Sequence, residues 1–389
     1  MVKGPLMTDL IKIHKNEYGC EPEFIGSAPG VLNLMGEHTD YNEGYVLQMA
    51  LEHRTRVAVS RRKDNSLRFF AADFSERKRT TIPNLKYKRE DRWANYCKGA
   101  LHGFLERGLN FKGLDITISG NVPIKIGLGS SASICVATAA AVNGLYNFQL
   151  KNLDLVQIAS DAEKEFMGLA RTITDPFVSC MAKPGKILFL DLRNLDYIHI
   201  PLNLGEYRLL VTNSNVPSIA EEEDLVEFQE ECQRCVDYLS QKRPGKALRD
   251  YSSGDLKNGM GLMPESSRRL CTHVVQEDER VCEARDALQK GDLAYLGKLM
   301  IRSHESLRDN YEVSCPELDW LVKRAWEIEG ILGARMTGYG FGGCTVTLIR
   351  DSAVEAYQKR LEEYEHIFGF STEKFFSLPG SGVEVQDLR

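Results

Sequence analysis

The feature that most restricts the fold of this chain is a strand, a glycine-rich turn and an apolar helix in direct succession. Residues 114–119 alternate between apolar and polar side chains, which predicts a strand, and residues 132–145 are small and apolar, which predicts a buried helix. The block that joins them, residues 123–133, contains Gly127 and Gly129. Because the first amides of a helix have no partner within it, this order predicts an anion-binding site where the helix begins.

This glycine-rich turn does not match two common phosphate-binding loops. A Walker loop needs Gly-Lys-Ser or Gly-Lys-Thr after four variable residues, and the dinucleotide fingerprint GxGxxG is also absent. On the residues alone, a tight turn that binds nothing therefore stays open as an alternative. If the turn does bind phosphates, the hydroxyl of Ser131 is a suitable ligand for Mg²⁺ beside them.

A second polar block lies earlier in the chain, at residues 36–41. It holds two carboxylates, an imidazole and two hydroxyls within six residues, after the turn at 28–30 and before the apolar run 45–51. So many hydrogen-bonding groups on one loop favour recognition of a polyhydroxylated ligand. Together with the glycine-rich turn, this block predicts a phosphate-handling enzyme that acts on a sugar-like molecule.

Length and composition indicate a globular protein with two domains. At 389 residues the chain exceeds one ordinary domain, and its 43% hydrophobic and 27% charged residues are average values. A net charge of −6 without a basic stripe argues against a nucleic-acid partner. No stretch reaches the roughly 18 apolar residues of a membrane span, and residues 1–23 lack the apolar core of a signal peptide. We therefore expect a cytoplasmic protein without a nucleic-acid or membrane partner.

The ten cysteines predict reduced thiols rather than a disulfide framework. Cys97, Cys135 and Cys344 lie in apolar or glycine-rich segments, where small buried thiols are common. Cys232 and Cys235 form a CxxC pair on a predicted charged helix. Because no second pair follows at metal-binding spacing, zinc or redox chemistry there stays the lesser alternative.

Periodic patterns predict further helices and strands on both sides of the two blocks. Helices are expected at residues 6–18, 93–107, 154–168, 221–240, 273–289, 292–303, 316–330 and 353–364. Strands are expected at residues 23–27, 56–60, 67–70, 186–190, 207–212 and 344–349. The boundary between two halves is expected near residues 191–206, and no internal repeat is visible.

Three blocks of this chain resemble the three motifs of the GHMP small-molecule kinases. Residues 28–41 are similar to the galactokinase signature in particular, and residues 127–132 and 333–344 are similar to the second and third motifs. The likeness continues through three shorter segments, 93–99, 212–216 and 303–307, so it spans nearly the whole chain. The resemblance implies an α+β fold of mixed sheets with helices packed on them. It also implies an N-terminal domain at 1–200, a C-terminal domain at 201–389 and an active site between them.

The resemblance implies a reaction and the residues that perform it. The expected enzyme is an ATP- and Mg²⁺-dependent phosphotransferase that phosphorylates the C1 hydroxyl of galactose or a related sugar, with no obligatory protein partner. Asp175 stands at the position of the family's catalytic aspartate. The positions that match sugar contacts are Glu37, His38 and Asp40. The positions that match nucleotide contacts are Trp93, Gly127, Leu128, Gly129, Ser130, Ser131 and Ala132, and those that match metal ligands are Ser131 and Glu163. Without the resemblance, Glu163 and Asp175 would be read as surface charges and Trp93 as a core aromatic residue.

The chain departs from the family pattern at a position next to the expected catalytic aspartate. Val31 stands where the first motif normally has an arginine. A guanidinium there lowers the pKa of the aspartate and offsets charge on the transferred phosphoryl group, and valine does neither. Loss of one such donor typically costs on the order of 10²–10³ in rate.

Further departures gather around the expected sugar site, whereas the turn from Gly127 onward is intact. Leu225 replaces a tyrosine, and Glu227 and Phe228 replace paired arginines. Three other departures, at Arg171-Thr172, Tyr339 and Lys125-Ile126, replace small residues.

Three hypotheses follow from these departures. The first is an active anomeric kinase in which Arg171 or Lys125 supplies the missing positive charge. The second is a kinase for a modified galacto-configured sugar. The third is a weakly active or inactive protein that senses sugar and nucleotide.

Overall fold

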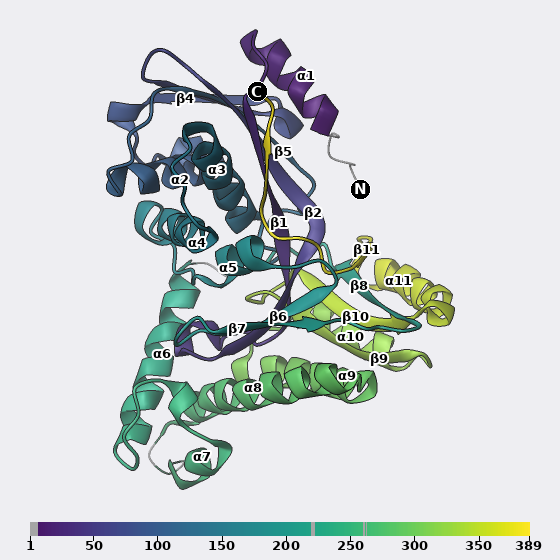
Figure 1. The fold of residues 1–389 in the computed structure, drawn as a ribbon. Coiled ribbons are helices and arrows are strands. Elements are labelled where there is room, and N and C mark those ends of the chain that lie inside the picture. Colours follow the sequence, from purple (N-terminus) through teal and green to yellow (C-terminus); the bar gives the residue numbers. More distant parts are fainter. Residues whose placement is uncertain (1–6, 219–221, 260, 262) are drawn as a thin grey trace.

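The strands of the chain form two sheets (Figure 1), in a computed structural model that describes residues 7–218, 222–259, 261 and 263–389. Among these residues, an eight-stranded sheet has the order β12-β1-β2-β5-β3-β4, with β6 pairing with β2 and β7. Its strands are β1 (Phe24–Met35), β2 (Tyr45–Arg61), β3 (Ser66–Ala71), β4 (Glu76–Thr81), β5 (Leu114–Gly120), β6 (Lys186–Asp191), β7 (Tyr197–Pro201) and β12 (Glu384–Asp387). A four-stranded sheet has the order β11-β8-β10-β9. Its strands are β8 (Tyr207–Asn213), β9 (Ile331–Thr337), β10 (Cys344–Arg350) and β11 (Glu373–Ser377).

The central pair, β1 and β2, is irregular where the polar blocks meet it. Their antiparallel register shifts once between Pro29 and Val31 and again between Asn33 and Met35. Such irregularities bend a strand and change the direction of its side chains. The first shift lies where the amide of Val31 donates to the carbonyl of Leu128 in the glycine-rich turn (3.0 Å), so the turn docks on the bend of β1.

Five helices pack around the larger sheet: α1 (Met7–Tyr18), α2 (Ala94–Glu106), α3 (Ser130–Tyr146), α4 (Asn152–Asp161) and α5 (Thr174–Met181). Figure 1 shows α2, α3 and α4 together beside β1 and β2, with α1 on the other side of these strands. The alanines of α3 and Gly26 of β1 together allow the helix to lie directly on the strand. The carbonyl of Ala137 occupies the space that a side chain at Gly26 would need. Close packing of this kind explains why residues 132–145 are small and apolar.

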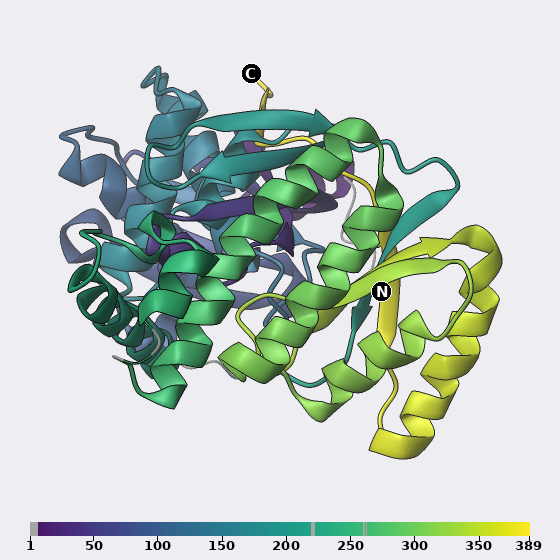
Figure 2. The ribbon, with the colours of Figure 1, turned by 90° about the horizontal axis from the view of Figure 1, so that it is seen from below.

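Two long antiparallel helices join the sheets from one side, α8 (Glu265–Lys290) and α9 (Leu293–Ser306). Figure 2 shows them side by side across strands of both sheets. One apolar cluster contains residues from all four parts, including Leu32, Met49, Val211, Val346, Val281 and Leu299. The sheets therefore share a core, which fixes their relative position.

The remaining helices cover the outside of this frame. They are α6 (Glu222–Ser240), α7 (Ser253–Gly259), α10 (Pro316–Trp326) and α11 (Val354–Phe368). α6 and α7 pack against each other and against α8, and α10 packs against α11 and the smaller sheet. Within the described ranges, no helix combines the length and apolarity needed to cross a bilayer.

The predicted helices are present, but several of their limits differ. The helix expected at 273–289 begins at Glu265. Its first eight residues are mostly polar and lack a clear apolar stripe, so the sequence pattern did not include them. The helix expected at 154–168 ends at Asp161 and continues as a π-helical turn, Ala162–Phe166. Residues 6 and 221, where two helices were expected to begin, lie outside the described residues.

The strand predictions underestimated pairing at the end of the chain. β12 consists of four exposed residues, so it carries no apolar alternation that a sequence pattern could detect. It pairs through its backbone with β1, from Phe24↔Asp387 to Ser27↔Glu384. Strands up to β7 lie in the larger sheet and β8 to β11 in the smaller one, and β12 returns to the first. The domain limits at 1–200 and 201–389 stay a prediction.

Candidate active site

Helix α3 begins directly at the glycine-rich turn. Gly129 is the residue before its first turn, with φ of 64°, and no side chain caps the helix. The amide of Ser133 donates to the carbonyl of Gly129 (3.0 Å), which is the first bond of the helix. The amides of Ser130, Ser131 and Ala132 precede that bond, so they are available to an anion at the helix start.

The glycine-rich turn is held between β1 and a loop of the other sheet. A side chain at Gly129 would approach Val31 to 3.0 Å, so the turn lies against β1 at the position of the missing arginine. A side chain at Gly127 would lie 3.1 Å from the Cα of Gly338. Glycine at both contacts lets the backbones of the two loops touch. The start of α3 is therefore located where the sheets meet.

The loop that touches this turn, residues 338–343, is firmly attached to its surroundings. The amide of Phe341 donates to the carbonyl of Val313 (2.7 Å). The amide of Gly343 donates to the carbonyl of Val216 (2.8 Å). These backbone bonds fix the middle and the end of the loop, although four of its six residues are glycines.

Asp175 lies in the first turn of α5, facing β1. Ser179, one turn later on the same helix face, donates from Oγ to the carbonyl of Pro29 (2.9 Å). Asp175 therefore lies on the side of α5 that faces β1, and its electrostatic interaction with Asp40 puts it near the polar loop at 36–41. Figure 1 shows α5 near the junction of the two sheets.

The carboxyl of Asp175 has the proton affinity of a general base near neutral pH. Burial raises its pKa to about 6, Arg171 lowers that pKa, and the nearby carboxylate of Asp40 raises it. At neutral pH the group is mostly ionised and still able to accept a proton, which is the range in which general bases are effective.

Asp40 presents one carboxylate oxygen without a hydrogen-bond partner. Its Oδ2 accepts from Thr172 Oγ1 (2.7 Å) and from the hydroxyl of Tyr339 (3.2 Å). Its Oδ1 is buried and accepts no hydrogen bond from the described residues. Burial raises the pKa of Asp40, and the two hydroxyl donors and the backbone amides of Tyr41 and Asp40 oppose that shift. A buried acceptor left open in this way suits the hydroxyl of a ligand.

Glu37 forms a buried ion pair that sequence reasoning missed. Its partner is Arg335 on β9, which is fully buried and also donates to the carbonyl of Leu34 (3.0 Å). The amide of Gly338 donates to the other oxygen of Glu37 (3.1 Å). The signal was an arginine inside an otherwise apolar strand pattern, Ile331–Thr337. Because both oxygens already have protein partners, the predicted sugar contact of Glu37 stays a prediction.

His38 lies in an aromatic enclosure. Its Nδ1 is 2.7 Å from the hydroxyl of Tyr41, and that hydroxyl is 2.7 Å from the hydroxyl of Tyr311. The ring of Tyr311 stacks on the imidazole at 4.2 Å, and Phe228 meets its edge at 5.6 Å. Burial and the neighbouring His273 lower the pKa of His38 to about 3, so the ring is neutral. Its predicted contact with sugar hydroxyls is likewise untested.

The two predicted magnesium ligands fit a hard cation. Glu163 is 2% exposed, on the π-helical turn Ala162–Phe166. Burial and the charge of Glu163 raise the pKa of the Cys135 thiol, and Cys135 lies one turn after Ser131 on α3. The carboxylate therefore lies close to the start of α3. Within the described ranges, no three His, Cys, Asp or Glu side chains form a metal cluster. One carboxylate and one hydroxyl suit Mg²⁺, which commonly takes its other ligands from phosphates and water.

Two further positions have ordinary surroundings. Trp93 precedes α2, and its Nε1 donates to Glu76 on β4 (2.8 Å). The indole is half-buried, and its predicted contact with adenine stays a prediction. Leu225 on α6 is fully buried. A buried apolar side chain therefore stands where the family has the polar hydroxyl of a tyrosine.

Of the two cations considered as substitutes for the missing arginine, Arg171 lies closer to the site. Its guanidinium carbon is 4.8 Å from the ring centre of Tyr339, and its charge lowers the pKa of Asp175. Lys125 is exposed and has φ of 63°, a conformation that non-glycine residues rarely adopt. The geometry therefore favours Arg171 as the charge beside Asp175.

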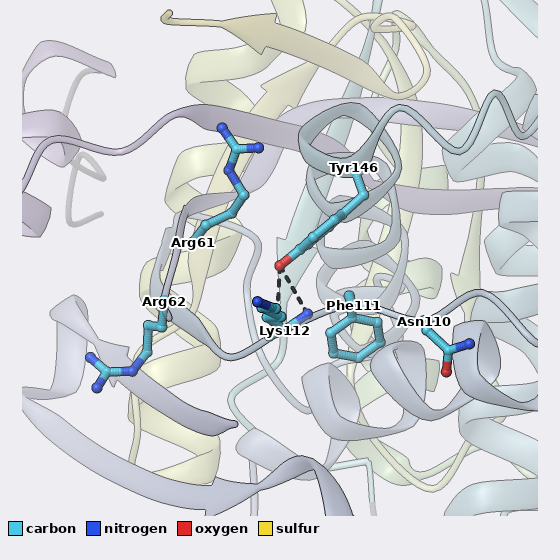
Figure 3. Close-up of a pocket in the computed structure, with 6 residues that line it drawn as sticks. All are labelled: Arg61, Arg62, Asn110, Phe111, Lys112 and Tyr146. Carbon is cyan, nitrogen blue, oxygen red and sulfur yellow. Dashed lines mark hydrogen bonds between the residues drawn. The ribbon is translucent and has the colours of Figure 1, made fainter. Parts of the chain in front are cut away.

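A surface pocket of about 430 Å³, drawn in Figure 3, is separate from this site. It is bordered by Tyr146, the last residue of α3, roughly 25 Å from the glycine-rich turn at 1.5 Å per residue. Two of its three cations are already paired, Arg61 with Glu23 and Arg62 with Asp64. The pocket therefore takes no part in the site between the sheets.

Comparison with sequence families gives three matches along the chain. Residues 12–61 match the galactokinase galactose-binding signature. Residues 95–183 match the GHMP kinases N terminal domain, and residues 284–366 match the GHMP kinases C terminal.

Curated proteins and solved structures give nearly full-length matches. The galactokinase of Streptococcus thermophilus is 38% identical over 379 residues, which cover 96% of this chain and 97% of that protein. The galactokinase of Exiguobacterium sibiricum is 36% identical, with coverages of 97% and 98%. Lactococcus lactis galactokinase complexed with galactose has a TM-score of 0.93 at 30% identity, covering 98% of this chain and 100% of that one. Methanococcus jannaschii mevalonate kinase, with a TM-score of 0.67 at 22% identity and coverages of 92% and 98%, shares the fold.

The buried ion pair predicts a large loss of stability when one partner is removed. Arg335→Met should lower the free energy of unfolding by about 3–5 kcal/mol, because it leaves the buried carboxyl of Glu37, whose pKa burial already raises to about 7, without its partner. The measurement is urea unfolding followed by circular dichroism.

The matched control is Arg350→Met on β10, whose ion pair with Glu206 is exposed and should contribute less than about 1 kcal/mol. The double variant Arg335→Met/Glu37→Gln should recover part of the loss, because neither charge of the pair remains. Equal effects of the two single variants would contradict this account of the pair.

Proposed function

This chain belongs to the galactokinase group of the GHMP kinase family, and from that premise we propose that it transfers the γ-phosphoryl group of ATP to the C1 hydroxyl of galactose. The family and the two-domain α+β fold expected from the sequence are confirmed by the family matches and by the Lactococcus lactis structure. The chain is therefore a phosphotransferase of carbohydrate metabolism, and the specific substrate and the residue roles below are proposals.

One observation supports the proposal: contacts through Gly338 and Tyr339 connect a helix start suited to phosphates with a buried acceptor, and that acceptor is near a carboxyl suited to a general base. The anion site is the start of α3, the base is Asp175 and the acceptor is Oδ1 of Asp40. Phosphoryl transfer to a sugar needs these three functions within reach of one another, because it depends on positioning and charge stabilisation.

In the proposed reaction, each group has one task. The amides of Ser130, Ser131 and Ala132 bind the phosphates of ATP at the helix start. Asp40 accepts a hydrogen bond from a sugar hydroxyl, which orients the ring. Asp175 accepts the proton of the C1 hydroxyl as that oxygen attacks the phosphorus. Glu37 and His38 stay in the proposal as predicted sugar contacts, and they also hold the loop that carries Asp40.

Magnesium belongs to the proposal through two residues. Ser131 and Glu163 would hold the ion, and when bound it neutralises charge on the phosphates. Both side chains provide hard oxygen donors, and Glu163 is buried close to α3.

Arg171 is proposed to replace part of what the family arginine does at position 31. Its guanidinium favours the ionised form of Asp175, as the family arginine would. Arg171 also lies over the face of Tyr339, so its position is held by an aromatic ring. This arrangement favours an active kinase over the alternative of a sugar sensor.

We further propose a cytoplasmic location. All ten cysteines are free of disulfides, and seven of them are buried. Unpaired thiols are the usual state in a reducing compartment.

The proposed reaction predicts that purified protein converts galactose and ATP to ADP and a C1-phosphorylated sugar, identified by ³¹P and ¹H NMR. Asp175→Asn should lower kcat by a factor on the order of 10²–10⁴, because it removes the proton acceptor and keeps the size of the side chain. Asp196→Asn, in the exposed turn between β6 and β7, is the matched control and should keep full activity. A wild-type protein that leaves galactose unphosphorylated would refute the proposed substrate.

The pH dependence of turnover tests the role of Arg171. For the wild type, kcat/KM for galactose should fall below a pH of about 6, as Asp175 takes up a proton. Arg171 favours the charged carboxylate, so Arg171→Met should raise the pKa of Asp175 and move this acid limb to higher pH. The exposed Lys125→Met is the control and should leave the limb in place. Identical acid limbs for wild type and Arg171→Met would exclude Arg171 from this role.

A further inference from the structure

We propose that three exposed side chains, those of Lys86, Lys88 and Arg89, form a cationic rim that steers nucleoside triphosphates toward the start of α3. The rim acts on the approach of the nucleotide and not on its final contacts. This inference rests on the proposed function and deepens it, because it assigns a surface of the chain to the entry of the anionic substrate.

The segment that carries the rim is positively charged, although the chain as a whole is negative. Residues 76–92 contain seven basic and three acidic residues, a net charge of +4, whereas the whole chain has −6. Lys86, Lys88 and Arg89 are exposed, and their side chains form no ion pair with any residue that the structure describes. Their charges are therefore open to the solvent through which a nucleotide approaches.

The rim is attached to the first turn of α2 by a buried lysine and an asparagine. Asn95 donates from Nδ2 to the carbonyl of Lys88 (2.7 Å). Lys98, which is 1% exposed, donates to Asn95 Oδ1 (2.9 Å) and to Asp91 (2.8 Å). The buried lysine thus offsets the charge of Asp91 next to the rim and fixes the asparagine that holds the backbone of Lys88.

The same turn of α2 lies beside the start of α3. Cys135, in the second turn of α3, donates from Sγ to the carbonyl of Tyr96 (3.6 Å). Lys88 and Cys135 therefore contact consecutive residues of α2, at positions 95 and 96. The glycine-rich turn is exposed at Gly127, so the helix start can be reached from solvent. The rim is thus an exposed positive surface next to the proposed phosphate site, between β4 and α2 in Figure 1.

Exposed charges beside a binding site change the rate of encounter more than the lifetime of the complex. Such charges raise the association rate constant, kon, of an oppositely charged ligand by about 10- to 1,000-fold. Their removal changes kon and its salt dependence, whereas loss of a direct, desolvated contact raises the dissociation rate constant, koff. Screening shortens the range of the field from about 30 Å at 0.01 M salt to about 3 Å at 1 M. Steering is therefore distinguished from direct contact by its rate constants and by salt.

The experiment measures kon and koff of ATP labelled with an N-methylanthraniloyl group, by stopped-flow fluorescence at ionic strengths of about 0.01 M and about 1 M. Calorimetric binding of unlabelled ATP at the same ionic strengths is the label-free check. The rim variant carries three substitutions, Lys86→Gln, Lys88→Gln and Arg89→Gln. All three positions are exposed, so the variant should fold like the wild type.

The matched control removes the same amount of charge far from the site. It carries Lys242→Gln, Lys246→Gln and Lys257→Gln, at exposed positions on α7 and in the segment before it. Figure 1 shows α7 at the opposite end of the molecule from β4. The control therefore separates the local effect of the rim from the effect of net charge.

Steering predicts a loss of kon that disappears in salt. At low ionic strength the rim variant should have a kon at least about fivefold below that of the wild type, with koff within about twofold. At about 1 M salt the two proteins should agree within about twofold. The control should match the kon of the wild type within about twofold at both ionic strengths.

The outcomes separate this inference from the proposed function. ATP binding by the wild type with an equal kon in the rim variant at low ionic strength would overturn the rim alone. An unchanged kon with a raised koff would also overturn it, in favour of a direct contact, and so would an equal loss of kon in the control. If the wild type binds no ATP, the proposed function fails and the inference fails with it. Should the rim variant not fold, as judged by circular dichroism, the wild type decides: a kon that does not depend on ionic strength would overturn the rim.

Discussion

The buried ion pair between Glu37 and Arg335 is the contact on which the rest of the site depends. It joins the polar loop after β1 to strand β9, so it connects the two sheets at the level of the site. The same carboxylate accepts the amide of Gly338, which fixes the loop that touches Gly127. A single pair of charges thus locates the polar loop, the glycine-rich turn and Tyr339 relative to one another. Such a pair adds little net stability, because desolvation offsets attraction, but its geometry is exacting.

The electrostatics of the site are organised around Asp175. Burial alone would push the pKa of this carboxyl upward, and the neighbouring Asp40 acts in the same direction. In the family pattern an arginine at position 31 opposes these effects. Here that position is a buried valine packed near Gly129, and Arg171 opposes them from the segment before α5. In the proposed mechanism the positive charge is thus kept near Asp175, while its origin in the chain has changed.

Sequence patterns could predict the parts of this protein that depend on local order. The strand, turn and helix at 114–145 follow from alternation, glycine and small apolar residues, and the family follows from three motifs. Contacts between distant segments had no local signal. The pairing of Glu37 with Arg335 joins residues that the motifs contain separately, and β12 pairs through its backbone without an apolar pattern. Tyr339 was noted only as a departure, because its bond to Asp40 exists only once the sheets meet.

The central claim is that Arg171 supplies the charge that Val31 lacks, and it is tested most directly by the turnover of four proteins: wild type, Val31→Arg, Arg171→Ala and the double variant. If the two cations are alternatives, their effects are strongly non-additive. Val31→Arg should change kcat of the wild type by less than about tenfold. Arg171→Ala removes one preorganised donor and should lower kcat by a factor on the order of 10²–10³. Adding Val31→Arg to Arg171→Ala should restore much of that lost activity. A wild type with almost no turnover that gains this full factor from Val31→Arg alone would contradict the account and indicate a sugar sensor.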